Sequence, residues 1–123
     1  KGWQTKELIQ SMQNNVLYGN TLLATSGTEG GKRVKMVAIN VNTGKFLWEE
    51  KGFNWAQLTG VNQTLLCMGV TGDLSTVKVS DKAFTEISRI KILDNICWTK
   101  ATYAGGRIYL RNNKGRVLCL GVK

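Results

Sequence analysis

Short runs in which apolar and polar residues alternate dominate this chain, and turn-forming residues separate them. In residues 37–42, the larger apolar side chains recur at every second position, which is the period of a β-strand with one side facing a core. Asn42, Thr43 and Gly44 then favour a turn, and Gly44 can adopt a positive φ without steric cost. Strand-forming residues resume at 46–48. This stretch is therefore predicted to be a β-hairpin.

The hairpin pattern recurs along the chain at a constant spacing. Three segments read as strand, tight turn and strand at offsets of 43 residues, namely 17–24, 59–67 and 102–110. A second anchor follows each of them, where Val37 aligns with Val77 at an offset of 40, and a one-residue shift aligns Leu118 in the third copy. The offset is 43 residues for the first hairpins but 40 for the following strands. This difference predicts a loop between the second and third strands that shortens from each copy to the next.

Each copy is predicted to hold four short strands, and the chain carries about two and a half copies of a unit of roughly 40 residues. An all-β unit of this length is typical of a β-propeller blade, which is a four-stranded antiparallel sheet. A blade cannot bury both of its sides alone, so neighbouring blades must stack on it. We therefore expect one partial propeller domain over 1–123, with repeats at about 12–54, 55–96 and 97–123.

Six residues around the first predicted hairpin carry a more specific pattern, namely Ala38, Asn40, Thr43, Gly44, Lys45 and Trp48. Their spacing resembles the tryptophan-docking motif of the PQQ-like (quinoprotein-like) β-propeller repeat family, although Asn40 stands where that family usually has Asp. The resemblance implies that Trp48 packs against the next blade, and that the chain supplies the C-terminal blades of a seven- or eight-bladed ring. The second copy has lost the motif, since Lys78 and Ser88 take the places of Ala38 and Trp48.

Fewer than three blades cannot close such a ring, and the sequence leaves three explanations open. The chain is the C-terminal part of a longer propeller, it completes a ring with further copies of itself, or it folds as an open stack with covered edges. Residues 1–10 precede the first copy and are available to pair as an outer strand elsewhere. Because Lys1 stands in the place of an initiator Met, we expect a processed product or a fragment.

The composition fits a folded domain, since 42% of the residues are hydrophobic. No apolar run approaches 18 residues, so no membrane span is expected. The net charge of +9 is concentrated near the end of the chain, where residues 95–123 hold six Lys and Arg and no acid. A basic last blade raises nucleic acid or an anionic surface as a partner, but only Tyr103 and Tyr109 accompany it. We therefore favour a solvated basic face over a nucleic-acid site.

Catalytic and metal chemistry finds little support in the residue types. The chain has no His, which removes imidazole bases and histidine zinc sites. Its three cysteines are neither adjacent nor at two-residue spacing, and the strand patterns around Cys67 and Cys119 favour buried structural thiols, whereas Cys97 lies outside them. The glycines of 27–33 lack the following helix that a phosphate loop needs. We predict no catalytic, cofactor-binding or metal-binding residues.

Two tryptophans mark the start of the second and third copies. Trp55 and Trp98 lie 43 residues apart, and this repeated placement favours a repeated structural role near the central channel, where first strands run. Because the mouth of a propeller channel is also where ligands bind, these two residues are the candidate ligand contacts.

The sequence therefore predicts a non-catalytic β-propeller module for binding or scaffolding, with a protein or a polysaccharide as partner. The family resemblance implies a bacterial protein exported to the periplasm or the cell surface. It also implies the main alternative, the C-terminal part of a quinoprotein dehydrogenase that would hold PQQ and calcium, although the vicinal cysteine pair of such enzymes is missing here. A binder of nucleic acid or anionic surfaces is the second alternative.

Overall fold

The computed structural model describes residues 2–10, 13–27, 34–53 and 55–121, and strands are the only regular structure in these ranges. The first sheet contains β1 (Val16–Tyr18), β2 (Thr21–Ser26), β3 (Lys35–Asn40) and β4 (Phe46–Lys51). The second sheet contains β5 (Ala56–Val61), β6 (Thr64–Gly69), β7 (Asp73–Lys78) and β8 (Glu86–Lys91). The third sheet contains β9 (Thr102–Ala104), β10 (Arg107–Arg111) and β11 (Val117–Gly121). The all-β prediction is confirmed, and none of the described residues form a helix that could cross a membrane.

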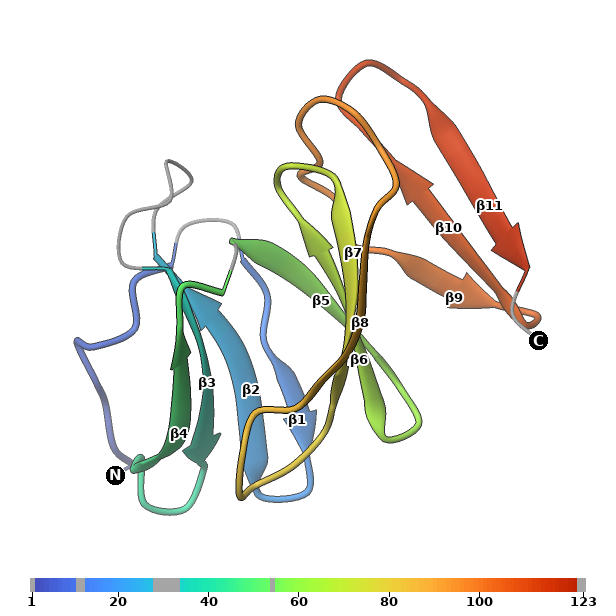
Figure 1. Ribbon diagram of the computed structural model, residues 1–123. Coiled ribbons are helices and arrows are strands. Elements are labelled where there is room, and N and C mark those ends of the chain that lie inside the picture. The colour runs from blue at the N-terminus through green and yellow to red at the C-terminus, as the bar shows by residue number, and fades with distance from the viewer. Residues whose placement is uncertain (1, 11–12, 28–33, 54, 122–123) are drawn as a thin grey trace.

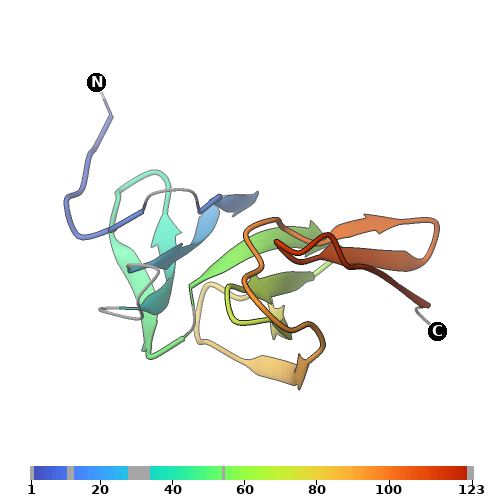
Figure 2. The ribbon, with the colours of Figure 1, turned by 90° about the horizontal axis from the view of Figure 1, so that it is seen from above.

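The three sheets stand side by side as separate antiparallel units (Figure 1). Within each sheet the strand order follows the chain, so every strand pairs with the one that precedes it. Seen from above, the sheets fan out, and the two chain ends lie at opposite ends of the row (Figure 2). β1 contacts β5, and β5 contacts β9, which brings the first strands of successive sheets next to one another.

Two-residue turns fix the register at the start of each sheet. Tyr18 pairs with Thr21, and Val61 pairs with Thr64, so both hairpins close over two residues. The third sheet repeats this turn within 104–107. Because the turns are equally long, equivalent residues of the first two strands are 43 positions apart, as the sequence predicted.

The third strands follow a different spacing from the predicted one. Ile39 and Val77 lie opposite equivalent residues of the second strands, so the second copy is offset by 38 residues and the predicted offset of 40 is wrong. A shift of two keeps the same side of the strand toward the core, so the alternation of apolar residues could not reveal it. The one-residue shift in the third copy was correct, because Leu118 takes the place of Val37.

The loop before β7 is the shortest of its kind, not the intermediate one that the sequence suggested. β6 ends at Gly69 and β7 begins at Asp73. Within this loop the Gly72 N–H donates to the Gly69 carbonyl oxygen at 3.0 Å. The Gly72 carbonyl in turn accepts hydrogen bonds from the N–H groups of Ile92 and Leu93. One glycine therefore closes the turn and anchors the chain that leaves β8.

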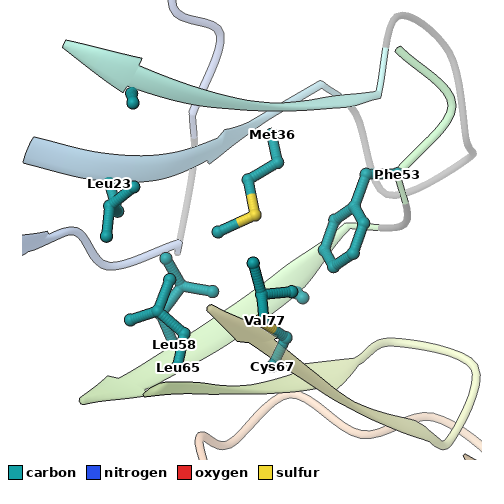
Figure 3. Packing of buried hydrophobic residues seen from close by; sticks show 9 residues of the cluster. Leu23, Met36, Phe53, Leu58, Leu65, Cys67 and Val77 are labelled. Carbon is teal, nitrogen blue, oxygen red and sulfur yellow. The ribbon is translucent and has the colours of Figure 1, made fainter. Parts of the chain in front are cut away.

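The first hydrophobic cluster lies between the first and second sheets (Figure 3). Leu23 and Met36 project from the first sheet toward Leu58, Leu65 and Val77 of the second. All five side chains are fully buried. Burial of this apolar surface, at roughly 25 cal/mol per Å², is the main force that holds the two sheets together.

The second hydrophobic cluster lies between the second and third sheets and follows from alternation along β6. Leu65 belongs to the first cluster, whereas Leu66 and Met68 belong to the second. Ile108 and Leu110 of β10 meet them from the third sheet. The second sheet thus has two apolar sides, and both are covered only because a sheet stands on each side of it.

Residues 2–10 form no strand and lie along the outer side of the first sheet (Figure 1). Leu8 packs against a third cluster that contains Val37 and Ile39. The Ile9 carbonyl accepts a hydrogen bond of 2.8 Å from the N–H of Gly27. The segment therefore covers an apolar face of its own chain, and it does not serve as an outer strand of another described sheet.

Gly72→Ala is expected to destabilise the fold far more than Gly52→Ala. Both glycines have φ in the left-handed region, at +97° and +82°, where a Cβ atom costs about 1–2 kcal/mol. At Gly72 the new Cβ would lie 1.9 Å from the Leu93 carbonyl oxygen, whereas nothing lies within 4 Å at Gly52. Urea unfolding should show a loss of about 1–2 kcal/mol for Gly52→Ala and above about 4 kcal/mol for Gly72→Ala. Equal losses would contradict the anchoring role of Gly72.

Candidate functional site

The predicted docking motif forms the turn between β3 and β4. The Asn40 side chain organises it, because its Oδ1 accepts hydrogen bonds from the N–H groups of Asn42 at 2.9 Å and Thr43 at 3.2 Å. The Gly44 N–H donates to the Asn40 carbonyl at 2.7 Å, and Gly44 has a φ of +75°. The Lys45 carbonyl accepts from the Asn40 N–H. An amide oxygen is an acceptor just as a carboxylate oxygen is, so Asn serves this turn in the place of Asp.

Trp48 reaches from the first sheet to the second. It lies on β4 opposite Ala38, and its indole N–H donates to the Ser80 carbonyl oxygen at 2.8 Å. Its ring meets Phe84 edge-on, with the ring centroids 5.9 Å apart. Phe84 contacts Phe53 in the same way at 5.5 Å. These aromatic rings join the cluster between the two sheets, with one polar atom fixed by a hydrogen bond.

Trp3 makes the same kind of contact with the first sheet. Its indole N–H donates to the Val41 carbonyl oxygen at 2.5 Å, and its ring lies so close to Gly44 that a Cβ there would be 2.6 Å away. Both partners belong to the turn between β3 and β4, as the partners of Trp48 belong to the segment between β7 and β8. Sequence reasoning missed Trp3. The one signal that could have found it is its spacing of 45 residues from Trp48, which is close to the length of the repeat.

A short distance after each of these tryptophans, the chain places an apolar residue in a hydrophobic cluster on the sheet that follows. Leu8, Phe53 and Leu93 each lie five residues after a tryptophan or its structural equivalent. They pack on the outer side of the first sheet, between the first and second sheets, and between the second and third sheets, respectively. Residues 3–8 therefore relate to the first sheet as residues 48–53 relate to the second.

Asn14 joins the first two sheets at their first strands. Its side-chain amide accepts from the Leu58 N–H at 2.8 Å and donates to the Leu58 carbonyl at 2.7 Å. Its own N–H donates to Gln57 Oε1 at 3.1 Å. The amide thereby satisfies both backbone groups of Leu58 as a neighbouring strand would. Thr59 Oγ1 links the second sheet to the third through the Ala101 carbonyl at 2.5 Å. Nothing in the local sequence pattern around Asn14 indicated this role.

The two tryptophans that are 43 positions apart have different surroundings. Trp55 stands just before β5 and is fully buried, and its indole nitrogen has no hydrogen-bond partner among the described residues. Trp98 stands in the segment before β9 and is 44% exposed. Equal spacing therefore does not give these residues equal environments, and ligand contact by either of them stays a prediction.

A cleft of about 750 Å³ lies between the N-terminal segment and the first sheet. Its charged lining residues are Lys6, Glu7, Lys35, Glu49 and Lys51. Lys35 and Glu49 form an ion pair, so the cleft contains charges of both signs. In the part of the chain that the structure describes, His, Cys, Asp and Glu side chains gather into no group of three that could hold a metal ion. The glycine-rich stretch at 28–33 lies outside the described residues.

The three cysteines are free thiols in different environments. Burial raises the pKa of the Cys67 thiol to about 12; nearby Glu86 adds to this effect and Arg89 opposes it. Burial also raises the pKa of the Cys97 thiol. Cys119 is exposed, so the prediction that it is buried was wrong. Exposed and less exposed residues do alternate along β11. Cys119 lies on the side of the third sheet that no other described sheet covers.

Comparisons with known proteins show the fold of this chain but do not assign it to a family. No protein-family model and no curated protein match the chain. Among solved structures, it is similar to BamB from Moraxella catarrhalis, a β-propeller, with a TM-score of 0.66 and 19% sequence identity. The match covers 92% of this chain and 32% of BamB, so the chain spans about a third of that protein. The three sheets are therefore propeller blades, and this likeness concerns the fold alone.

Replacing Trp48 should weaken the joint between the first two sheets in two steps. Trp48→Phe keeps an aromatic ring near Phe84 but removes the donor to Ser80, at an expected cost of about 1 kcal/mol. Trp48→Ala removes both contacts and, because the ring is only partly buried, should cost about 3 kcal/mol, at the low end of the range for a tryptophan. Trp98→Phe is the matched control and should cost about 0.5 kcal/mol or less. Guanidinium unfolding followed by far-UV circular dichroism measures all three, and a Trp48→Ala loss as small as the control would rule out a docking role.

Thiol labelling should separate the exposed cysteine from the buried ones. Near pH 8, about one equivalent, Cys119, is expected to react quickly with an aromatic disulfide reagent. Cys67 should react only after unfolding. Because the folded pKa of Cys67 lies above its unfolded value, the folded state retains the proton, and stability should fall as pH rises from about 8.5 toward 12. Cys67→Ala should remove that part of the pH dependence, and two fast equivalents in the folded protein would contradict the assignment.

Proposed function

We propose that this chain is a non-catalytic module for binding or scaffolding, made of consecutive blades of a larger β-propeller. The observation that carries the proposal is the repeated contact of Trp3 and Trp48, each of which attaches an outer segment to the turn of the following sheet. By this equivalence, residues 2–10 correspond to the end of a preceding blade. Both tryptophans thus make contacts between blades, and this favours a structural and binding role for the chain.

The docking turn supports the finer proposal that the blades are PQQ-like repeats. Asn40 holds this turn through two backbone N–H groups, and Gly44 supplies its positive φ. Trp48 then extends from β4 to the neighbouring blade. With the family resemblance, we propose a bacterial protein exported to the periplasm or the cell surface, with a protein or a polysaccharide as its partner. The likeness to BamB supports this proposal at the level of the fold.

The ring is proposed to be completed by blades outside this chain rather than by further copies of it. A ring of copies would place the third sheet of one chain on the outer side of the first sheet of the next. Residues 2–10 already cover that side, with Leu8 in its apolar cluster and Trp3 on its turn. As the end of a preceding blade, this segment marks the side as the place of the rest of that blade, just as residues 48–53 lie where the first sheet packs on the second.

A titration with PQQ and Ca²⁺ tests the non-catalytic proposal against the quinoprotein alternative. Tryptophan fluorescence of the chain, corrected for absorbance by the quinone, is expected to stay unchanged as PQQ is added with excess Ca²⁺. The same titration with a chelator in place of Ca²⁺ is the control for non-specific quenching. A saturable decrease that needs Ca²⁺ would overturn the proposal in favour of part of a quinoprotein dehydrogenase.

A further inference from the structure

We propose that a row of lysines, one at the end of each outer strand, binds an acidic polysaccharide across successive blades. This inference rests on the proposed binding function and names the class of its partner. The lysine row consists of Lys6, Lys51 and Lys91, and each of them lies three residues after a docking tryptophan or its structural equivalent. All three lysines are exposed.

The lysine row lies at the face of the blades where the second and fourth strands of each sheet end. β2 and β4 are both antiparallel to β3, so they run in the same direction and end at the same face (Figure 1). Lys51 and Lys91 are the last residues of β4 and β8. Blades of a propeller pack through the sides of their sheets, so this face stays open to a partner in a closed ring.

The chain itself indicates that this position stays exposed when a blade has neighbours. Lys51 is exposed although the four-stranded second sheet follows it, and Lys91 is exposed although the four-stranded first sheet precedes it. Because the two residues occupy equivalent places in the repeat, neither a following nor a preceding blade covers the position. We therefore expect the blades that complete the ring to leave the lysine row free.

The ammonium groups of the lysine row are available to a ligand. None of the three lysines takes part in an ion pair within the described ranges. Lys91 Nζ donates one hydrogen bond to the Thr71 carbonyl, which leaves two of its three donors. Stacked sheets lie about 10 Å apart, so the lysine row presents spaced positive charges rather than a dense patch.

A groove of about 380 Å³ beside Lys91 supplies contacts for sugar rings. Its other lining residues are Val70, Thr71, Asn95 and Ile96, which all belong to this chain, so the groove does not depend on blades outside it. Ile96 is 37% exposed, and Asn95 is exposed as well. A sugar has apolar C–H faces and hydroxyl groups, so it can pack on Ile96 while the Asn95 amide exchanges hydrogen bonds with its hydroxyls.

Carboxylates beside the lysines favour a sparsely charged chain over a nucleic acid. Glu7 follows Lys6, Glu50 precedes Lys51, and both carboxylates are exposed. Double-stranded DNA carries a negative charge about every 1.7 Å along its axis, so it would meet these carboxylates as well as the lysines. A polysaccharide with neutral sugars between its acidic ones places hydroxyl groups there, and hydroxyls donate to carboxylate oxygens.

Binding of a labelled hyaluronan decasaccharide, in which uronic acid alternates with a neutral sugar, tests the inference. Fluorescence anisotropy at low salt is expected to show saturable binding to the wild-type chain. Lys6→Gln/Lys51→Gln/Lys91→Gln should weaken binding at least tenfold, and the new glutamine at 91 can still donate to the Thr71 carbonyl. The unlabelled disaccharide, as a competitor, should bind at least tenfold more weakly than the decasaccharide, because it reaches one lysine at a time.

Two further variants separate the lysine row and its groove from general charge attraction. Lys45→Gln/Lys78→Gln/Lys82→Gln removes three exposed charges near the opposite face and should change the affinity less than twofold. Asn95→Gly keeps every charge and accepts the φ of +65°, and it should weaken binding at least threefold. Circular dichroism checks the fold of each variant, and the dependence on glycan length provides the test if the lysine substitutions disturb folding.

Several results would overturn the inference. These are no saturable binding of the decasaccharide, an equal loss with the control lysines, and a disaccharide that binds as tightly as the decasaccharide. Tighter binding of a 20-nucleotide oligo-dT, lost in the variant of the lysine row, would assign the lysine row to nucleic acid instead. None of these results depends on the PQQ titration, so the polysaccharide site and the non-catalytic function can fail separately.

Discussion

The fold depends on the fact that the first and second sheets each have two apolar sides and can cover neither side by themselves. In β6 the consecutive residues Leu65 and Leu66 enter different clusters, one toward the first sheet and one toward the third. A strand with apolar residues on both sides is stable only inside a stack, because either bare side would leave a large apolar surface in water. The row of sheets is therefore the smallest unit in which the second sheet can exist, and its stability arises between sheets as much as within them.

The two ends of the row meet this requirement in different ways. The outer side of the first sheet keeps an apolar cluster around Val37, and Leu8 of the N-terminal segment covers part of it. On the side of the third sheet that faces away from the second sheet, Arg111 stands at the position of the buried Met68, whereas Val117 at the position of Leu74 is still apolar. At one end of the row the chain itself covers the outer side of the first sheet. At the other end, charged residues allow the outward side of the third sheet to be exposed to water.

Polar contacts fix the sheets relative to one another at both edges. At the outer edge, the indole N–H groups of Trp3 and Trp48 donate to turn carbonyls of the following sheet. At the inner edge, Asn14 satisfies the N–H and carbonyl groups of Leu58. Hydrophobic burial has no preferred direction, so it does not set the angle between two sheets, whereas these hydrogen bonds act at defined positions. The buried indole nitrogen of Trp55 is the exception, a donor left unpaired among the described residues.

The sequence by itself determined the strands, the turns and the spacing of 43 residues, because turn residues such as Gly44 and alternating side chains act within a few positions of the chain. Alternation could not place Val77 opposite its correct partner, since a shift of two residues leaves the same side chains facing the core. Only the tertiary structure decided that Trp3 repeats the contact of Trp48, and that an amide side chain joins the first strands. The exposure of Cys119 was likewise beyond the sequence pattern. Each of these depends on which surface lies against another, and that is set by sheets distant in the chain rather than by neighbouring residues.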